Sequence, residues 1–264
     1  ATNGHGMPSL NSLYLSGYPM LSGTIPRYFG NLGHSSSPKP KLTQLYLNDN
    51  PRLTGTVPTE LGKLTALEEL ALQGNAGITG SIPREFGKLK RVRQLYLSHG
   101  GFSGSIPTEL GDMAALTSAY VDRNPGISGS LPAALGQLTN LQRFDCFDNT
   151  ALGGSIPALK SCSSLTQLDL QNCSFSQLPR SLPDSLTHAY LNNNPINAHT
   201  SELSELLSSL LPNASMHVLD IGFVNSRVQL VGNGSGAYHM STGTGFGTRV
   251  SNPSPCVLGK PCAF

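Results

Sequence analysis

Leucine and other aliphatic residues recur through most of this chain at fixed spacings. The segment that begins at Leu42 reads LTQLYLNDNPRLTGTVPTELGKL, and similar segments begin at Leu67, Val92, Leu116 and Leu141, at intervals of 25, 25, 24 and 25 residues. A degenerate copy begins earlier and shorter or altered copies follow, at Leu10, Leu165, Leu186 and Met216. The chain is therefore built from about nine repeats.

Each repeat begins with LxxLxL, in which the alternating apolar side chains point to one side of a short strand and the residues between them point to the other. One repeat buries too little apolar surface to offset the entropy lost in ordering its backbone. The repeats must therefore stack, and the pattern predicts a solenoid whose LxxLxL strands form one continuous sheet.

Asparagine, glycine and proline stand at fixed places in the repeats. An asparagine at the bend after the strand is expected to be buried and to bond backbone groups of neighbouring repeats, at Asn50, Asn75, Asn124, Asn149 and Asn194. Tyr18, Gly100 and Cys173 take its place elsewhere, which predicts an interrupted ladder. Proline then favours the first position of a short helical turn, and a glycine such as Gly62 or Gly111 favours its end.

Departures from the repeat divide the chain. An insertion at residues 33–41 predicts a surface loop, and the spacing of leucines in residues 201–211 predicts a fuller helix. The repeats end near residue 221, so we interpret residues 1–221 as a solenoid. Residues 222–264, with strands expected at 227–231 and 237–240, form either an end cap or the start of a further module.

Composition excludes some classes of protein. Charged residues make up only 12% of the chain and the net charge is +2, so binding of nucleic acid through a basic face has no support. No apolar stretch approaches the roughly 18 residues that cross a bilayer. The start at Ala1 has no leader character, which indicates a mature product or a fragment.

The consensus LxxLxLxxNPxLtGxIPxxLGxL resembles the plant-type extracellular leucine-rich repeat, from residue 10 to about residue 221. This resemblance implies an α/β solenoid, a right-handed arc with a parallel β-sheet on its concave side and short second strands and 3-10 or short helices on its convex side. It also implies an extracellular location and functions like those of receptor-like kinase ectodomains and polygalacturonase inhibitors. Caps with paired cysteines are usual in the family, yet no cysteine precedes Cys146. Either a cap is missing or another domain covers the first repeat.

The residue between the last two leucine positions of each strand is the strongest candidate for binding. Five of the eight tyrosines occupy this column, at Tyr14, Tyr46, Tyr96, Tyr120 and Tyr190. Tyrosine concentrates in binding surfaces because it offers a large rigid contact area with a hydroxyl group. The alternative is that tyrosine simply favours strands and covers the sheet.

Acidic residues gather toward the C-terminal repeats. Residues 1–93 hold ten basic and five acidic side chains, whereas residues 94–264 hold seven and ten. The candidate ligand-binding residues on the concave face are Tyr46, Tyr96, Tyr120, Asp122, Asp145, Asp148, Asp169 and Tyr190. Such a patch, with Asp220 at its end, suits a basic peptide, a protein or a polar glycan. Carboxylates of adjacent repeats could share a calcium ion, but a solvated acidic face is the commoner outcome, and we expect no metal.

Cysteines and glycosylation sequons are consistent with secretion. We expect Cys256 and Cys262 to form a disulfide and Cys146, Cys162 and Cys173 to be packed thiols. Candidate N-glycosylation sites are Asn172, Asn213 and Asn233.

No catalytic motif stands out: HExxH, GxSxG and Walker-type loops are absent from the sequence, and residues 243–247 suggest only a flexible glycine loop. We therefore expect a protein that is not an enzyme and needs no cofactor. The leading hypothesis is an extracellular module that binds a protein, peptide or glycan on its concave face. The alternative is a structural glycoprotein of a cell wall, extracellular matrix or surface filament, whose partners are other subunits.

Overall fold

The computed structural model describes residue 7 and residues 9–33, 41–179, 181–197, 205–206, 216–223, 226–232, 238–243 and 254–256; from residue 222 onward only the backbone is described. Most of the predicted surface loop at 33–41 lies outside these residues. The predicted helix at 201–211 also does, except for Glu205 and Leu206, which are helical.

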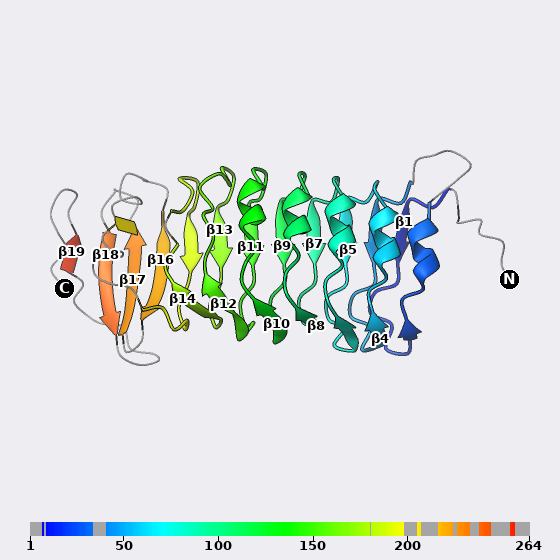
Figure 1. Ribbon diagram of the computed structural model, residues 1–264, viewed down its shortest axis with the longest axis horizontal. Coiled ribbons are helices and arrows are strands. Elements are labelled where there is room, and N and C mark those ends of the chain that lie inside the picture. The colour runs from blue at the N-terminus through cyan, green and yellow to red at the C-terminus, as the bar shows by residue number, and fades with distance from the viewer. Residues whose placement is uncertain are drawn as a thin grey trace.

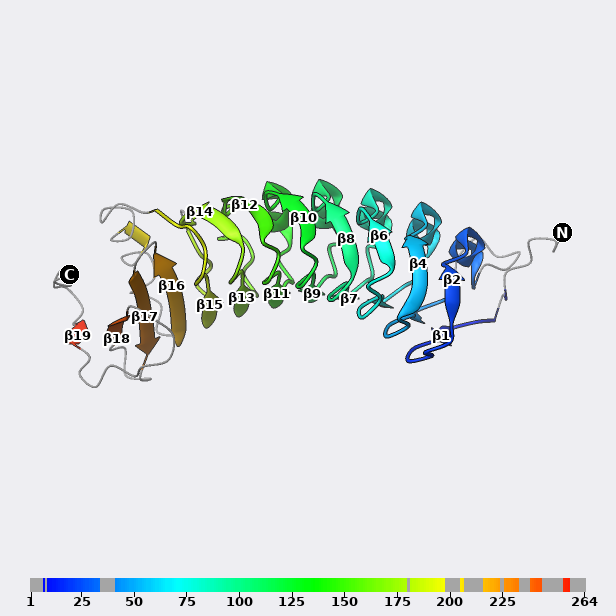
Figure 2. The ribbon, with the colours of Figure 1, turned by 90° about the horizontal axis from the view of Figure 1, so that it is seen from below.

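The concave side of the molecule is a single parallel sheet made from the LxxLxL segments (Figures 1 and 2). Each repeat adds one strand, and each strand pairs in register with those of the repeats before and after it. The parallel strands are β1 (Ser12–Tyr14), β3 (Gln44–Tyr46), β5 (Glu69–Ala71), β7 (Gln94–Tyr96), β9 (Ser118–Tyr120), β11 (Arg143–Asp145), β13 (Gln167–Asp169), β15 (His188–Tyr190) and β16 (Val218–Phe223). The predicted solenoid is confirmed.

The sheet continues past the last repeat with antiparallel strands. β16 pairs with β17 (Ser226–Gly232), which pairs with β18 (Tyr238–Gly243), which in turn pairs with β19 (Ser254–Cys256). The two strands expected after residue 221 are thereby confirmed. Because the direction of pairing reverses at β17, the stacking of repeats ends there.

The convex side carries a second parallel sheet and a row of 3-10 helices (Figure 2). Its strands are β2 (Ser22–Thr24), β4 (Arg52–Thr56), β6 (Ile78–Gly80), β8 (Gly101–Gly104), β10 (Gly126–Gly129), β12 (Ala151–Ser155) and β14 (Ser174–Gln177). The helices are η1 (Arg27–Asn31), η2 (Thr59–Lys63), η3 (Arg84–Lys88), η4 (Thr108–Asp112) and η5 (Ala133–Gln137). In the described residues after β12 and β14, turns replace the helix.

One hydrophobic core runs between the two sheets along the whole stack. It consists of the leucine positions of each concave strand and the aliphatic residue before each convex proline. Phe86, Phe102 and Phe175 are fully buried and widen this core from the convex side. A repeat therefore buries its apolar residues only against its neighbours, as the sequence predicts.

The predicted asparagine ladder is present. Asn149 shows the pattern: its side-chain nitrogen donates to the carbonyl oxygens of Val121 (3.1 Å) and Cys146 (2.9 Å), and its Oδ1 accepts the backbone N–H of Asn124 at 2.7 Å. Asn149 is completely buried, so these bonds satisfy backbone groups that water cannot reach. Each asparagine thus bonds its own repeat to the preceding one.

Gly100 and Cys173 interrupt the asparagine ladder inside the stack, and the structure compensates for them in different ways. At Gly100 no side chain is available, and the backbone N–H donates to Asn124 Oδ1 at 3.1 Å. At Cys173 the thiol partly replaces the amide, since its Sγ lies 3.3 Å from the carbonyl oxygen of Cys146. Burial raises the pKa of this thiol to about 12, so it stays protonated and can donate.

The glycine within each helical turn is required for a different reason from the one predicted. Gly111 is not at positive φ and lies inside η4, so it does not end the helix by a left-handed residue. A Cβ added there would lie 2.4 Å from the carbonyl oxygen of Ala134 in the next repeat. The glycine is required because neighbouring helical turns are in close contact.

Replacing Asn149 by alanine should lower the free energy of unfolding by at least about 2 kcal/mol, because it leaves the buried N–H of Asn124 without an acceptor. Asn140→Ala is the matched control: Asn140 is exposed and donates one bond, to the carbonyl oxygen of Ala114. It should cost about 1 kcal/mol or less. Urea unfolding of both variants checks this, and equal losses would contradict the ladder's role.

Replacing Gly111 by alanine should destabilise the protein by about 1–3 kcal/mol, because the next repeat must shift to admit the methyl group. A glycine with free space at negative φ would instead gain about 0.4–1 kcal/mol on the same change, through a less flexible unfolded chain. Thermal unfolding therefore tests the packing explanation by the sign of the change.

Candidate functional site

The tyrosines of the concave face stack in pairs. The ring centroids of Tyr14 and Tyr46 are 4.9 Å apart, and those of Tyr96 and Tyr120 are 5.0 Å apart with an angle of 3° between the rings. Ala71 separates the two pairs, because it occupies the same column in β5. Tyr46, Tyr96, Tyr120 and Tyr190 are half-buried, so each presents one part of its ring to solvent.

The hydroxyl groups of the paired tyrosines bond polar residues of the adjacent column. Tyr46 donates to Glu69 Oε2, Tyr96 donates to Gln94 Oε1, and Tyr14 donates to Gln44 Oε1 at 2.5 Å. Partial burial, followed by the bond to Glu69, raises the pKa of Tyr46 above its ordinary value. Burial also raises the pKa of Tyr96, so Tyr46 and Tyr96 are neutral at physiological pH and their hydroxyl groups are held by hydrogen bonds.

Asp145 of β11 is nearly inaccessible and paired with a cation. It is 3% exposed, and Arg143 holds it: Arg143 Nε and Nη2 lie 2.8 and 2.7 Å from Asp145 Oδ2. The Arg143 guanidinium also lies over the Tyr120 ring, 5.4 Å from its centroid. Asp145 Oδ1 is buried without a hydrogen-bond donor. Burial raises the pKa of Asp145 although Arg143 opposes the shift.

Asp169 of β13 stands beside Asp145 in register but has no arginine. Its donors are neutral groups of Gln171, the backbone N–H at 3.2 Å from Oδ1 and Nε2 at 3.1 Å from Oδ2. Burial raises the pKa of Asp169 to about 6, and the charges of Asp145 and Asp122 add to the shift while the bonds from Gln171 reduce it.

The other predicted carboxylates lie beyond the strand column. Asp122 is 5% exposed and accepts the Ser98 hydroxyl at 2.5 Å. Asp148 is half-buried and forms an ion pair with Arg123 at 3.2 Å. The structure thus brings Asp122, Asp145 and Asp169 to one part of the concave face. They are buried there and do not form the solvated acidic face that the sequence suggested.

A second polar ladder, which was not predicted from the sequence, runs along the edge of the concave face. Residues at positive φ follow each strand, and four of their side-chain contacts are continuous: His99 to Arg123 at 2.7 Å, Arg123 to Asp148, Asp148 to Asn172 at 2.6 Å and Asn172 to Asn193 at 2.7 Å. The signal was available, because the residue before the ladder asparagine is repeatedly Asp, Asn or Gly, which tolerate left-handed backbone.

The cysteine and glycosylation predictions are tested only in part. Cys146, Cys162 and Cys173 are buried free thiols, as expected. The expected disulfide between Cys256 and Cys262 and the sequons at Asn213 and Asn233 lie outside the residues whose side chains the structure describes. Asn172 is half-buried and its amide nitrogen donates to Asp148 Oδ1 at 2.6 Å, and its glycosylation stays a prediction.

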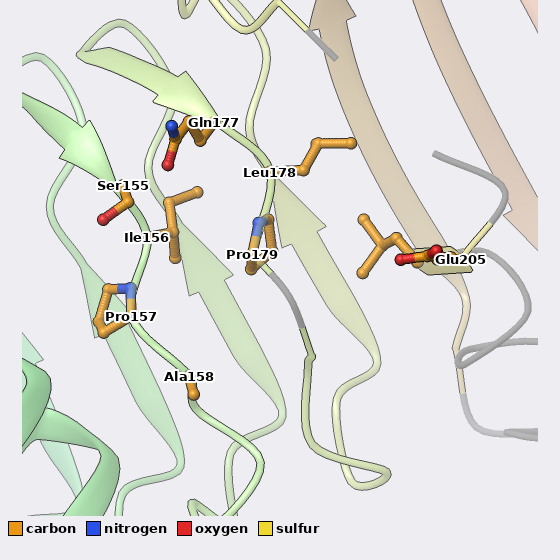
Figure 3. Close-up of a pocket in the computed structure, with 9 residues that line it drawn as sticks. Ser155, Ile156, Pro157, Ala158, Gln177, Leu178, Pro179 and Glu205 are labelled. Carbon is orange, nitrogen blue, oxygen red and sulfur yellow. The ribbon is translucent and has the colours of Figure 1, made fainter. Parts of the chain in front are cut away.

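A groove of about 690 Å³ opens on the convex side where the helices stop (Figure 3). It is lined by the ends of β12 and β14 and by residues 205 and 206, and Figure 3 shows Leu178 and Pro179 on its wall. Glu205 is the one ionisable residue among its nine described lining residues, so these offer no pair for acid–base catalysis.

The described part of the chain has neither a cluster of metal-binding side chains nor a helix that could span a membrane. No group of three or more His, Cys, Asp or Glu side chains is placed to hold a metal ion. None of the helices there has the length and apolar character that crossing a membrane requires.

Comparison with known proteins agrees with the geometry. The family model described as Leucine Rich Repeat matches residues 164–184. No curated protein sequence matches the chain significantly. Together with the repeats and the fold, the family match and the structures below identify the chain as a leucine-rich repeat protein whose repeats are like those of plant receptor-kinase ectodomains.

Solved structures extend this likeness. The ectodomain of the Arabidopsis thaliana receptor kinase GASSHO1/SCHENGEN3, in complex with CASPARIAN STRIP INTEGRITY FACTOR 2, is 29% identical over 80% of this chain and 24% of its own, with a TM-score of 0.66. The Arabidopsis HAESA ectodomain, in complex with an IDA peptide hormone, is 28% identical over 71% and 30%, with a TM-score of 0.57. A plant ice-binding protein, 24% identical over 74% and 68% with a TM-score of 0.55, shares the fold. The chain thus spans less than a third of either ectodomain.

Asp169 should make stability depend on pH. Its pKa is about 6 in the folded protein and about 4 in the unfolded chain, so the folded state binds more protons between these values. Its carboxyl therefore destabilises the fold above pH 6, and this cost is relieved as the pH falls toward 4. Asp169→Asn should be more stable than wild type at pH 7.5, by up to about 2 kcal/mol, with the difference vanishing near pH 4.

Thermal unfolding from pH 4 to pH 8 measures this effect. Asp145, Asp122, Arg143 and Tyr190 face the same region and remain in the variant, so the comparison isolates one carboxyl. Asp184→Asn, at a side chain that is 75% exposed, is the control and should leave the profile unchanged. Parallel profiles for wild type and Asp169→Asn would contradict the assignment.

Proposed function

We propose that this protein is a non-catalytic extracellular recognition module that binds a peptide or protein segment on its concave face. The observation that carries the proposal is the pair of stacked tyrosines Tyr96 and Tyr120, half-exposed at the centre of a continuous sheet. Rigid aromatic rings give a partner large contact area at low entropic cost.

The surroundings of these rings support binding over mere covering of the sheet. Tyrosines that only cover a sheet need no hydrogen bond to fix the hydroxyl group. Tyr46 and Tyr96 instead donate hydrogen bonds to neighbouring side chains, so their rings are positioned before a partner binds. Arg143, 42% exposed, lies over the Tyr120 ring and adds a polar group beside the stacked pair of Tyr96 and Tyr120. The column thus combines aromatic anchors with polar groups, as binding surfaces do.

The similar structures support the choice of partner and location. The GASSHO1/SCHENGEN3 and HAESA structures are of plant receptor ectodomains in complex with a factor and a peptide hormone. By analogy, we assign this chain an extracellular location and a peptide or protein partner; a glycan on the same face is the weaker reading. The structural glycoprotein of a wall or filament is the alternative, in which the concave face contacts other subunits.

The double variant Tyr96→Ala, Tyr120→Ala should lose binding to peptides selected by the wild-type protein from a displayed library of random peptides. A loss of roughly 30-fold or more in affinity is expected, because both rings would be central anchors. Biolayer interferometry measures the affinity, and thermal unfolding confirms that the variant is folded.

Tyr28→Ala is the matched control, since Tyr28 is 64% exposed on η1 at the convex side. It should bind the selected peptides as wild type does. If no peptide is selected, or if the Tyr28 variant loses as much affinity as the double variant, the concave face is not the binding surface. Concentration-dependent assembly that the double variant abolishes, seen by sedimentation velocity, would favour the structural alternative.

A further inference from the structure

Two acidic residues occupy equivalent positions on neighbouring strands, but only one of them has a cation. Asp145 and Asp169 are direct partners in the sheet, as are the residues two places before them, Arg143 and Gln167. Arg143 ion-pairs with Asp145 in β11. In β13 the neutral Gln167 stands where the arginine would be, and no cation lies within ion-pair distance of Asp169 among the described residues.

A second observation indicates that the missing group is a hydrogen-bond donor. Asn192, on the repeat after Asp169, is 6% exposed, and its Oδ1 is buried without a donor. Its nitrogen lies 3.5 Å from Gln171 Oε1, and Gln171 Nε2 donates to Asp169. Gln171 therefore links a carboxylate that is bonded only by neutral donors to an amide oxygen that has no donor, and buried acceptors are normally satisfied.

Arg143 shows within this chain which group suits such a place. Its guanidinium binds a buried carboxylate with two nitrogens and lies over a tyrosine ring at the same time. Asp169 has Tyr190 as its direct partner on β15, and the side chain of Tyr190 is half-buried. A carboxylate and a tyrosine ring are thus direct neighbours again, with the ring on the following strand instead of the preceding one and without the arginine.

We propose that the concave surface formed by Asp169, Gln171, Tyr190 and Asn192 binds an arginine side chain of the peptide partner. The guanidinium displaces the Gln171 amide, donates to the Asp169 carboxylate and to Asn192 Oδ1, and lies against the Tyr190 ring. This inference rests on the proposed function, and it names the chemistry of the partner: a peptide with an arginine aligned to β13.

The first test uses peptides selected by the wild-type protein from a displayed library of random peptides. Arginine should be enriched at one position of the selected peptides. Synthesis of one such peptide with citrulline in place of that arginine removes the charge and keeps the shape, and this should weaken binding by about tenfold to a hundredfold.

The second test places an arginine of the chain itself beside Asp169, in the proposed binding site. Gln167→Arg places a guanidinium two residues before Asp169, as Arg143 stands before Asp145, so it should pair with Asp169 and abolish the difference between the arginine and citrulline peptides. Asp169→Asn should do the same by removing the acceptor charge. Gln137→Arg adds the same charge at an exposed position of η5 on the convex side, away from the proposed site, and should keep the full difference.

The outcomes separate the two proposals. If peptides bind through Tyr96 and Tyr120 but show no arginine preference, or if citrulline binds equally well, the arginine site is wrong and the proposed function stands. An arginine preference that survives in Gln167→Arg and Asp169→Asn places the arginine elsewhere and also overturns the inference. Failure to select any peptide overturns both.

Discussion

The structure depends on one constraint: no repeat can bury its leucines alone. Each concave strand from β1 to β15 contributes only three residues, and its apolar side chains are covered by the neighbouring repeats. The buried asparagines reinforce this dependence, because Asn149 bonds carbonyl groups of two repeats and accepts from the backbone of one of them. Spacing and register are therefore fixed for every side chain, including those on the outside.

The same register determines what the concave face can do. Side chains at one position of the repeat become neighbours at strand spacing, so tyrosines stack on tyrosines and aspartates stand beside aspartates. Stacked rings are favourable, whereas adjacent carboxylates repel each other and lose hydration. The chain neutralises Asp145 with Arg143 and leaves Asp169 with a raised pKa. The concave surface therefore has a free-energy cost when no partner is bound, and a bound partner can reduce that cost.

Much of the fold could be predicted from the sequence, because the same spacing of residues recurs in each repeat. The concave strands, the asparagine ladder and the tyrosine column follow from periodicity, whereas the second strands of the convex side follow from the resemblance to the plant-type repeat. Burial of Asp122 and Asp169 could not be predicted, since it depends on how closely neighbouring side chains cover them. The reason for Gly111 was also missed, because its close contact is with Ala134 of the next repeat. Sequence spacing gives the position of a residue, but not how close the next turn lies.

The most direct test of this account is a crystal structure of the protein with a peptide that it has selected. The account predicts a peptide that crosses the concave strands between β7 and β15, with contacts to the rings of Tyr96 and Tyr120. A peptide bound instead to the convex sheet, or in the groove beside Leu178, would contradict it, because the register of the concave face would then have no part in recognition.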